Sequence, residues 1–136
     1  MIKVEAPIFG IAWTPDGTSV ATHTAPGLSA ARDILGFGPG LDAETSPLVA
    51  LEFDRGSPAF SPDGRWVAYE SDKTGRYEVF VRPYPDVDSS RFRVSTDGGQ
   101  FPAWAHSGDE LFYLNVDGEV VAARLEVSSE VRVVGR

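Results

Sequence analysis

The fold of this chain is decided by the stretch Pro58-Ala59-Phe60-Ser61-Pro62-Asp63-Gly64, which has two further copies. These are Ile11-Ala12-Trp13-Thr14-Pro15-Asp16-Gly17 and Pro102-Ala103-Trp104-Ala105-His106-Ser107-Gly108. Aligned on the alanine, the three copies lie 47 and 44 residues apart. In the first two, proline presets φ and the following glycine accepts the left-handed conformation, which is typical of a tight turn between strands. The chain is therefore predicted to contain three copies of one supersecondary unit.

Short β-branched and aromatic runs flank each copy, and no stretch keeps an apolar period of 3.6 residues, so almost no helix is expected. Around the second copy, strands are predicted at 58–60, 65–70, 77–82 and 91–95, the last alternating as an outer strand with one wet face. The other copies give the predicted strands 9–13, 19–24, 31–37, 48–53, 110–114, 119–125 and 130–134. The sequence thus predicts an all-β chain of three four-stranded antiparallel units.

A repeat of about 40 to 45 residues is typical of one blade of a β-propeller. The blades are predicted at approximately 8–53, 57–97 and 101–134, within a single domain covering residues 1–136. Closed propellers need about 4 to 8 blades, so three blades do not finish a ring alone. The sequence therefore implies a partner or a missing remainder.

The residues that follow the second copy also resemble a known family. The matching segments are Ser57–Tyr69, Ser71–Pro85, Val94–Gly99 and Asp109–Tyr113. They are similar to TolB-type, WD-repeat-like propellers, and resemble the C-terminal blades of propellers fused to bacterial serine/threonine kinases. The resemblance is strong from about residue 57 to 125 and weaker from 8 to 56. It implies six blades in the complete ring and a binding platform rather than a catalyst.

Two departures from that family are visible. The third turn reads Ala105-His106-Ser107-Gly108 instead of Ser/Thr-Pro-Asp-Gly. About half of the expected ring is absent, along with every kinase element.

Composition narrows the possible partners. Twelve Lys and Arg against 20 Asp and Glu give a formal net charge of −8, which repels phosphate backbones and anionic bilayers. No apolar stretch approaches the roughly 18 residues of a membrane span, and the first residues lack a signal peptide pattern. We therefore expect neither nucleic acid nor membrane as a partner. The chain as given is predicted to be cytoplasmic, or extracytoplasmic if it is part of a longer protein.

Equivalent positions of the repeats supply the candidate site residues. The aromatic position is predicted to wedge between neighbouring blades, with an aromatic ligand cage as the alternative. The turn aspartates are predicted to bond their own turn backbone, with an acidic ring for a cation or basic peptide as the alternative. The repeat positions are Trp13, Phe60, Trp104, Asp16, Asp63, Gly17, Gly64 and Gly108.

Other motifs are incomplete. Asp86–Ser90 begins like a calcium loop, but Arg91 stands where glycine is needed and no glutamate closes it. Gly36–Gly40 lacks the third glycine of a phosphate loop. His23 and His106 are too few for a histidine-rich metal site and have no hydrolase elbow beside them, so both are interpreted as structural or exposed. Because the chain has no cysteine, thiolate chemistry is excluded. No catalytic, cofactor-binding or metal-binding residue is predicted.

The sequence favours a non-enzymatic propeller module that binds a protein or peptide and is closed by homodimerisation into a six-bladed ring. The alternative is a fragment or accessory sensor domain of a larger bacterial enzyme such as a serine/threonine kinase. A hydrolase is disfavoured because nucleophile, base and oxyanion-hole signals are missing. Met1–Glu5 alternates apolar and polar residues, and we expect it to add an outer strand to the third blade of the partner copy.

Overall fold

The computed structural model describes residues 8–24, 34–38, 47–49 and 55–136. These residues form twelve β-strands and no helix, so the all-β prediction is confirmed. The strands are β1 (Ile8–Trp13), β2 (Val20–Thr24), β3 (Ile34–Phe37), β4 (Pro47–Val49), β5 (Arg55–Phe60), β6 (Trp66–Ser71), β7 (Glu78–Pro83), β8 (Phe92–Arg93), β9 (Gln100–Trp104), β10 (Glu110–Leu114), β11 (Val120–Val127) and β12 (Val131–Gly135).

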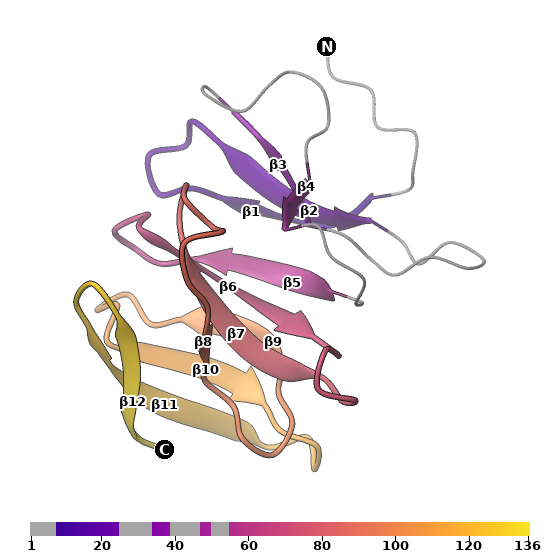
Figure 1. Cartoon of the computed structure of the whole chain (residues 1–136), viewed down its shortest axis with the longest axis vertical. Coiled ribbons are helices and arrows are strands. Elements are labelled where there is room, and N and C mark those ends of the chain that lie inside the picture. Colours follow the sequence, from indigo (N-terminus) through magenta and orange to yellow (C-terminus); the bar gives the residue numbers. More distant parts are fainter. Residues whose placement is uncertain (1–7, 25–33, 39–46, 50–54) are drawn as a thin grey trace.

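The strands form three antiparallel sheets of four, each in simple sequence order. We call β1–β4 blade 1, β5–β8 blade 2 and β9–β12 blade 3. The blades follow one another along the long axis of the molecule, with blade 2 between the other two (Figure 1). The first strand of blade 2, β5, contacts both β1 and β9, so the first strands of the three blades gather along one edge.

Each of these first strands carries one left-handed residue at the same repeat position. Gly10 has φ 63°, Ser57 has φ 51° and Phe101 has φ 53°. The pairing register shifts beside Gly10 and Ser57, as at a β-bulge. The backbone N–H of Phe101 donates to the carboxylate of Glu70 at 2.8 Å, which ties blade 3 to the buried second strand of blade 2.

Two apolar clusters join the blades. Because side chains alternate across a strand, successive residues of β6 face opposite neighbours. Val67 and Tyr69 pack with Ala21 and Ile34 of blade 1, whereas Ala68 packs with blade 3. The blade 3 side of the second cluster is made by Leu111, Tyr113, Ala123, Leu125 and Val131. The core of this chain therefore lies between blades, as in a stack of sheets.

The last strand of blade 2 is shorter than expected. The sequence predicted a strand at 91–95, but β8 contains only Phe92 and Arg93. The N–H of Val79 donates to the side-chain oxygen Oγ of Ser95 at 2.7 Å, and the N–H of Val94 donates to the Val79 carbonyl at 2.9 Å. A side-chain hydroxyl therefore takes the place of a backbone partner and ends the ladder.

Several predictions concern residues that the structure does not describe. Met1–Glu5, and parts of the strands predicted at 31–37 and 48–53, lie outside the described residues. Among the residues that are described, no helix is long and apolar enough to cross a membrane.

Candidate binding site between the turns of neighbouring blades

The three repeat turns share one backbone geometry. In each, the turn glycine donates its N–H to the carbonyl of the residue three positions earlier, at 2.8, 2.9 and 3.0 Å for Gly17, Gly64 and Gly108. The φ angles of these glycines are 70°, 72° and 79°, a region that side-chain-bearing residues rarely adopt. The turn glycines therefore have the role that the sequence predicted.

The turn aspartates are held by their own turns. Oδ1 of Asp16 accepts from Oγ1 of Thr14 at 2.6 Å and from the N–H of Thr18 at 3.0 Å. Oδ1 of Asp63 accepts from Oγ of Ser61 at 2.6 Å and from the N–H of Arg65 at 3.0 Å. The interpretation of these residues as turn formers is thus supported, rather than an acidic ring.

The same bonds set the ionisation of the aspartates. For Asp16, the hydrogen bonds from Thr14 and Thr18 lower the pKa of the carboxyl. For Asp63, burial acts to raise the pKa, but the Ser61 and Arg65 hydrogen bonds outweigh it and leave the pKa lowered. Both groups are anionic at neutral pH and already engaged, which makes them poor general bases.

The third turn replaces the aspartate by a different pair. Ser107 occupies the place of Asp63, and its hydroxyl donates to Oδ1 of Asp109, two residues further on. His106 stands where the other turns have proline, and it is exposed. This turn keeps the hydroxyl–carboxylate pairing although its sequence departs from the other two.

Successive turns approach one another closely. A Cβ added to Gly64 would lie 3.4 Å from Cδ of Pro15, and one added to Gly108 would lie 3.8 Å from Cδ of Pro62. The proline of one turn therefore faces the glycine of the next turn.

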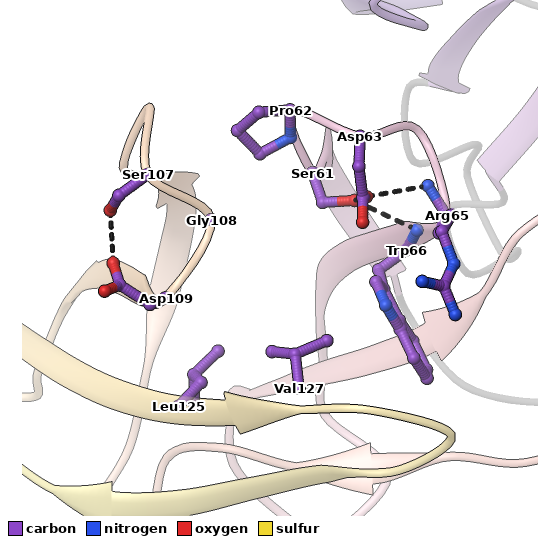
Figure 2. A pocket seen from close by; sticks show the side chains of 10 residues that line it. All are labelled: Ser61, Pro62, Asp63, Arg65, Trp66, Ser107, Gly108, Asp109, Leu125 and Val127. Atoms are coloured by element: carbon purple, nitrogen blue, oxygen red, sulfur yellow. Dashed lines mark hydrogen bonds between the residues drawn. The ribbon is translucent and has the colours of Figure 1, made fainter.

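A pocket of about 320 Å³ opens between the turns of blades 2 and 3 (Figure 2). Its rim carries Asp63, Arg65 and Asp109, and Leu125 and Val127 of β11 line its apolar side. An equivalent pocket of about 390 Å³ lies between the turns of blades 1 and 2, bordered by Pro15, Asp16, Gly64 and Tyr84. The same end of the molecule is thus hollowed between each pair of neighbouring blades.

Trp66 also lines the first pocket and was not singled out by the repeat pattern. Its side chain is buried and meets Phe92 edge to face at a centroid distance of 6.0 Å. Its indole N–H is buried and has no hydrogen-bond acceptor among the described residues. A buried donor without an acceptor is uncommon in folded proteins.

The predicted aromatic wedges hold at two of three positions. Phe60 packs at the joint of blades 1 and 2 and meets the ring of Tyr84 edge to face at 4.9 Å. Trp104 packs at the joint of blades 2 and 3, and its Nε1 donates to the Ala59 carbonyl at 3.1 Å. Trp13 is 62% exposed, because no described residue covers that face of blade 1, and its packing between blades stays a prediction. Phe60 and Trp104 belong to different joints, so the repeated rings form no cage.

The remaining candidates fall elsewhere. The loop 86–90 is fastened by Arg82, whose NH1 donates to the Val87 carbonyl at 2.7 Å. Gly36 lies in β3, and the side chain of His23, like residues 39 and 40, is outside the described part. No group of three or more potential metal ligands was found within residues 8–24, 34–38, 47–49 and 55–136.

The sequence analysis did not identify the buried carboxylate of Glu78 or its hydrogen-bond network. Glu78 is fully buried and accepts hydrogen bonds from Nε of Arg76 at 2.9 Å, NH2 of Arg93 at 2.6 Å, the N–H of Gly98 at 3.2 Å and Oγ of Ser95. Burial acts to raise the pKa of Glu78, but these donors outweigh it and the pKa is lowered. The network fastens β7 to the chain that leaves β8, so its role is structural.

Comparison with known proteins supports the architecture. The chain is 28% identical over 117 residues to an uncharacterised protein of Agrobacterium fabrum, covering 84% of this chain and 38% of that protein. It superposes on a putative TolB from Agrobacterium tumefaciens with TM-score 0.70 and 27% identity, covering 97% of this chain and 46% of that one. The β-propeller domain of the Trilobed protease from Pyrococcus furiosus gives TM-score 0.64 at 16% identity, with 96% and 41% covered. No protein-family model matches.

The chain is therefore a set of consecutive β-propeller blades. More particularly, its blades are of the TolB type, as the sequence indicated. The chain spans less than half the length of each relative named above.

Proposed function

We propose that this chain is a non-catalytic half-propeller, that two copies close a six-bladed ring, and that the ring binds a protein or peptide segment at the end where the repeat turns lie. Two observations support the proposal. The three blades match 46% of a TolB-type chain, and the outward faces of both end blades carry exposed apolar side chains. Apolar faces of this kind are covered by a partner in stable proteins.

The chemistry of the turn pockets favours binding over catalysis. The hydroxyls of Ser61 and Ser107 each donate to a carboxylate within their own turn. The lowered pKa of Asp63 suits a permanent anion better than a proton acceptor near neutral pH. A serine nucleophile needs a free base and an oxyanion hole, and these pairs supply neither.

A peptide suits the pocket between blades 2 and 3. Its apolar side, at Leu125 and Val127, fits one apolar side chain of a ligand. The rim side chains of Asp63, Arg65 and Asp109 fit the polar, uncharged amide groups of a peptide main chain.

Two measurements test this function. Light scattering should give a solution mass of twice the 14.7 kDa chain mass at micromolar concentration, and a monomer would contradict the ring. Short peptides selected from a random phage-displayed library should bind the wild type and lose affinity for Arg65→Glu. The control Lys73→Glu reverses a charge on the loop after β6, at the opposite end of that strand. Equal binding by both variants would contradict the assignment of this pocket.

A second candidate is supported by the length of the relatives. The curated relative is more than twice as long as the matched segment, so the chain is alternatively a section of a longer propeller-bearing protein. In that case the neighbouring blades come from the same polypeptide. The size of the native open reading frame separates this candidate from the homodimer.

A further inference from the structure

The two ends of the three-blade arc present different faces. Residues directly opposite in an antiparallel pair point to the same side of the sheet. Trp13 lies opposite Val20, and Ala12 lies opposite Ala21, which is buried against blade 2. Ile11 and Trp13 therefore face away from blade 2, and each is 62% exposed. We call Ile11, Trp13 and Val20 the front face.

The outward side of blade 3 follows from the same rule. Leu111, Trp104 and Ala123 are in register and face blade 2. The neighbouring triplet of Ala103, Phe112 and Ala122 is also in register, so it faces outward. Val120, two residues before Ala122 on β11, is 69% exposed. We call Ala103, Phe112, Val120 and Ala122 the rear face.

The interface between blades 2 and 3, which we call a joint, shows how a front face and a rear face pack together within this chain. There the front of blade 3 meets the rear of blade 2, where Ala59, Ala68 and Val81 are the in-register triplet. Trp104 packs on this joint and donates Nε1–H to the Ala59 carbonyl at 3.1 Å. In the repeat, Trp13 is equivalent to Trp104, and the rear triplet of blade 3 is equivalent to that of blade 2.

We propose that the front face of each copy docks on the rear face of a second copy, with Trp13 packed on the partner's Phe112 and Ala122 and its indole N–H donating to the partner's Ala103 carbonyl. This inference rests on the proposed function and specifies which residues close the ring. Each copy offers one front and one rear face, so two copies satisfy both faces and the assembly closes with two-fold symmetry.

The turns on the same side of blade 1 are consistent with this joint. The glycines of turns 2 and 3 each face the proline of the preceding turn, whereas an added Cβ at Gly17 would meet nothing within 4 Å. The front of the first turn is thus open where the other two are occupied. In the joined ring, the partner's His106 stands at the place of that proline.

Variants of both faces test the joint. Trp13→Glu puts a charge on the front face and Ala122→Arg puts one on the rear face. Each variant alone should raise the dimer dissociation constant more than about 100-fold, since a buried Trp is a typical interface anchor and the ring contains two joints. The matched control Val116→Glu changes a side chain that is 63% exposed and lies at the hairpin after β10, and it should leave the dimer intact.

Mixing the two variants separates this joint from other dimers. A mixed dimer has one wild-type joint and one joint in which the introduced glutamate and the introduced arginine face each other, so mixing should restore the dimer seen by light scattering. Failure of mixing to restore it would overturn the head-to-tail joint. An unaltered Trp13→Glu dimer would overturn the role of Trp13 while leaving homodimerisation standing. A wild type that stays monomeric would overturn the proposed function itself.

Trp13→Phe tests the hydrogen bond and remains informative if the glutamate variant does not fold. It keeps an aromatic ring but removes the N–H, so the affinity of each joint should fall about fivefold. An unchanged dissociation constant would contradict the bond to the partner's Ala103.

Discussion

Glu78→Gln tests the most concentrated set of interactions in blade 2. The wild-type carboxylate is fully buried and has four donors around it: the guanidinium groups of Arg76 and Arg93, the hydroxyl of Ser95 and the N–H of Gly98. A glutamine has one acceptor oxygen and turns its NH₂ group toward donors. The substitution keeps the volume of the side chain, so its effect reports on charge and hydrogen bonding rather than packing.

The magnitude follows from the exposure of the partners. Removing one member of a buried ion pair costs about 3 to 5 kcal/mol of unfolding free energy. The side chains of Arg76 and Arg93 are 48% and 41% exposed, so water solvates them after the change. We therefore expect about 3 kcal/mol, the lower end of that range.

Urea unfolding at pH 7, followed by far-ultraviolet circular dichroism, measures this loss. The matched control is Glu126→Gln, which breaks the ion pair with Arg132. The side chains of Glu126 and Arg132 are 62% and 73% exposed. An exposed pair of this kind contributes about 0.5 kcal/mol or less. If Glu78→Gln costs no more than the control, the reasoning about the buried carboxylate is refuted.

Three further predictions concern stability. The pKa of Glu78 is lowered below its ordinary value of 4.5, so the contribution of this carboxylate to the free energy of unfolding is complete above pH 4.5 and is lost as pH falls toward the folded-state pKa. Measuring the urea midpoint at a series of acidic pH values checks this, and Glu78→Gln should flatten the dependence of the midpoint on pH. Trp104→Ala should cost about 3 kcal/mol because it empties the joint of blades 2 and 3, and calorimetry showing an unchanged melting temperature would contradict that packing. Gly99→Ala should cost about 1 to 3 kcal/mol, since its Cβ would lie 2.7 Å from Cβ of Ser95 and 3.0 Å from Cγ2 of Val79; a stability equal to wild type in urea would show that this contact relaxes freely.

The parts of the fold that were predictable from sequence depend on local chemistry. The proline and glycine of the Pro-Asp-Gly turns restrict the backbone angles of these turns, and the β-branched runs between the turns favour strands. For this reason the strands around Ser61–Gly64 were predicted within two residues at most ends. Local rules also suggested that Asp16 and Asp63 bond within their turns, because the partners are only two residues away.

The missed features depend on residues that are distant in the chain. Glu78 is surrounded by donors from both sides of β8, and no local rule brings positions 76, 93 and 98 together. Its signal was a charged residue directly before the apolar run Val79–Val81.

The left-handed backbone at Ser57 and Phe101 was also missed, since neither residue type prefers that region. At Phe101 the backbone N–H is held by the distant Glu70 carboxylate. At the equivalent position of blade 1 the sequence has Gly10, a residue type that adopts this conformation readily.

Trp13 shows the limit of repeat equivalence. Its sequence position matches Phe60 and Trp104, but burial depends on whether a neighbouring blade is present on that side. The repeat correctly predicts the direction in which the side chain faces. It does not supply the surface that covers it.

The claim that two copies close one ring is tested most directly by crosslinking the proposed joint. The chain has no cysteine, so the double variant Ile11→Cys, Ala103→Cys carries one thiol on the front face and one on the rear face. A short bismaleimide linker should convert the protein into a covalent dimer and form no larger species, because both joints lie within one closed ring. A ladder of trimers and longer chains would reveal an open head-to-tail polymer, and a band at the 14.7 kDa chain mass alone would show that the faces do not meet.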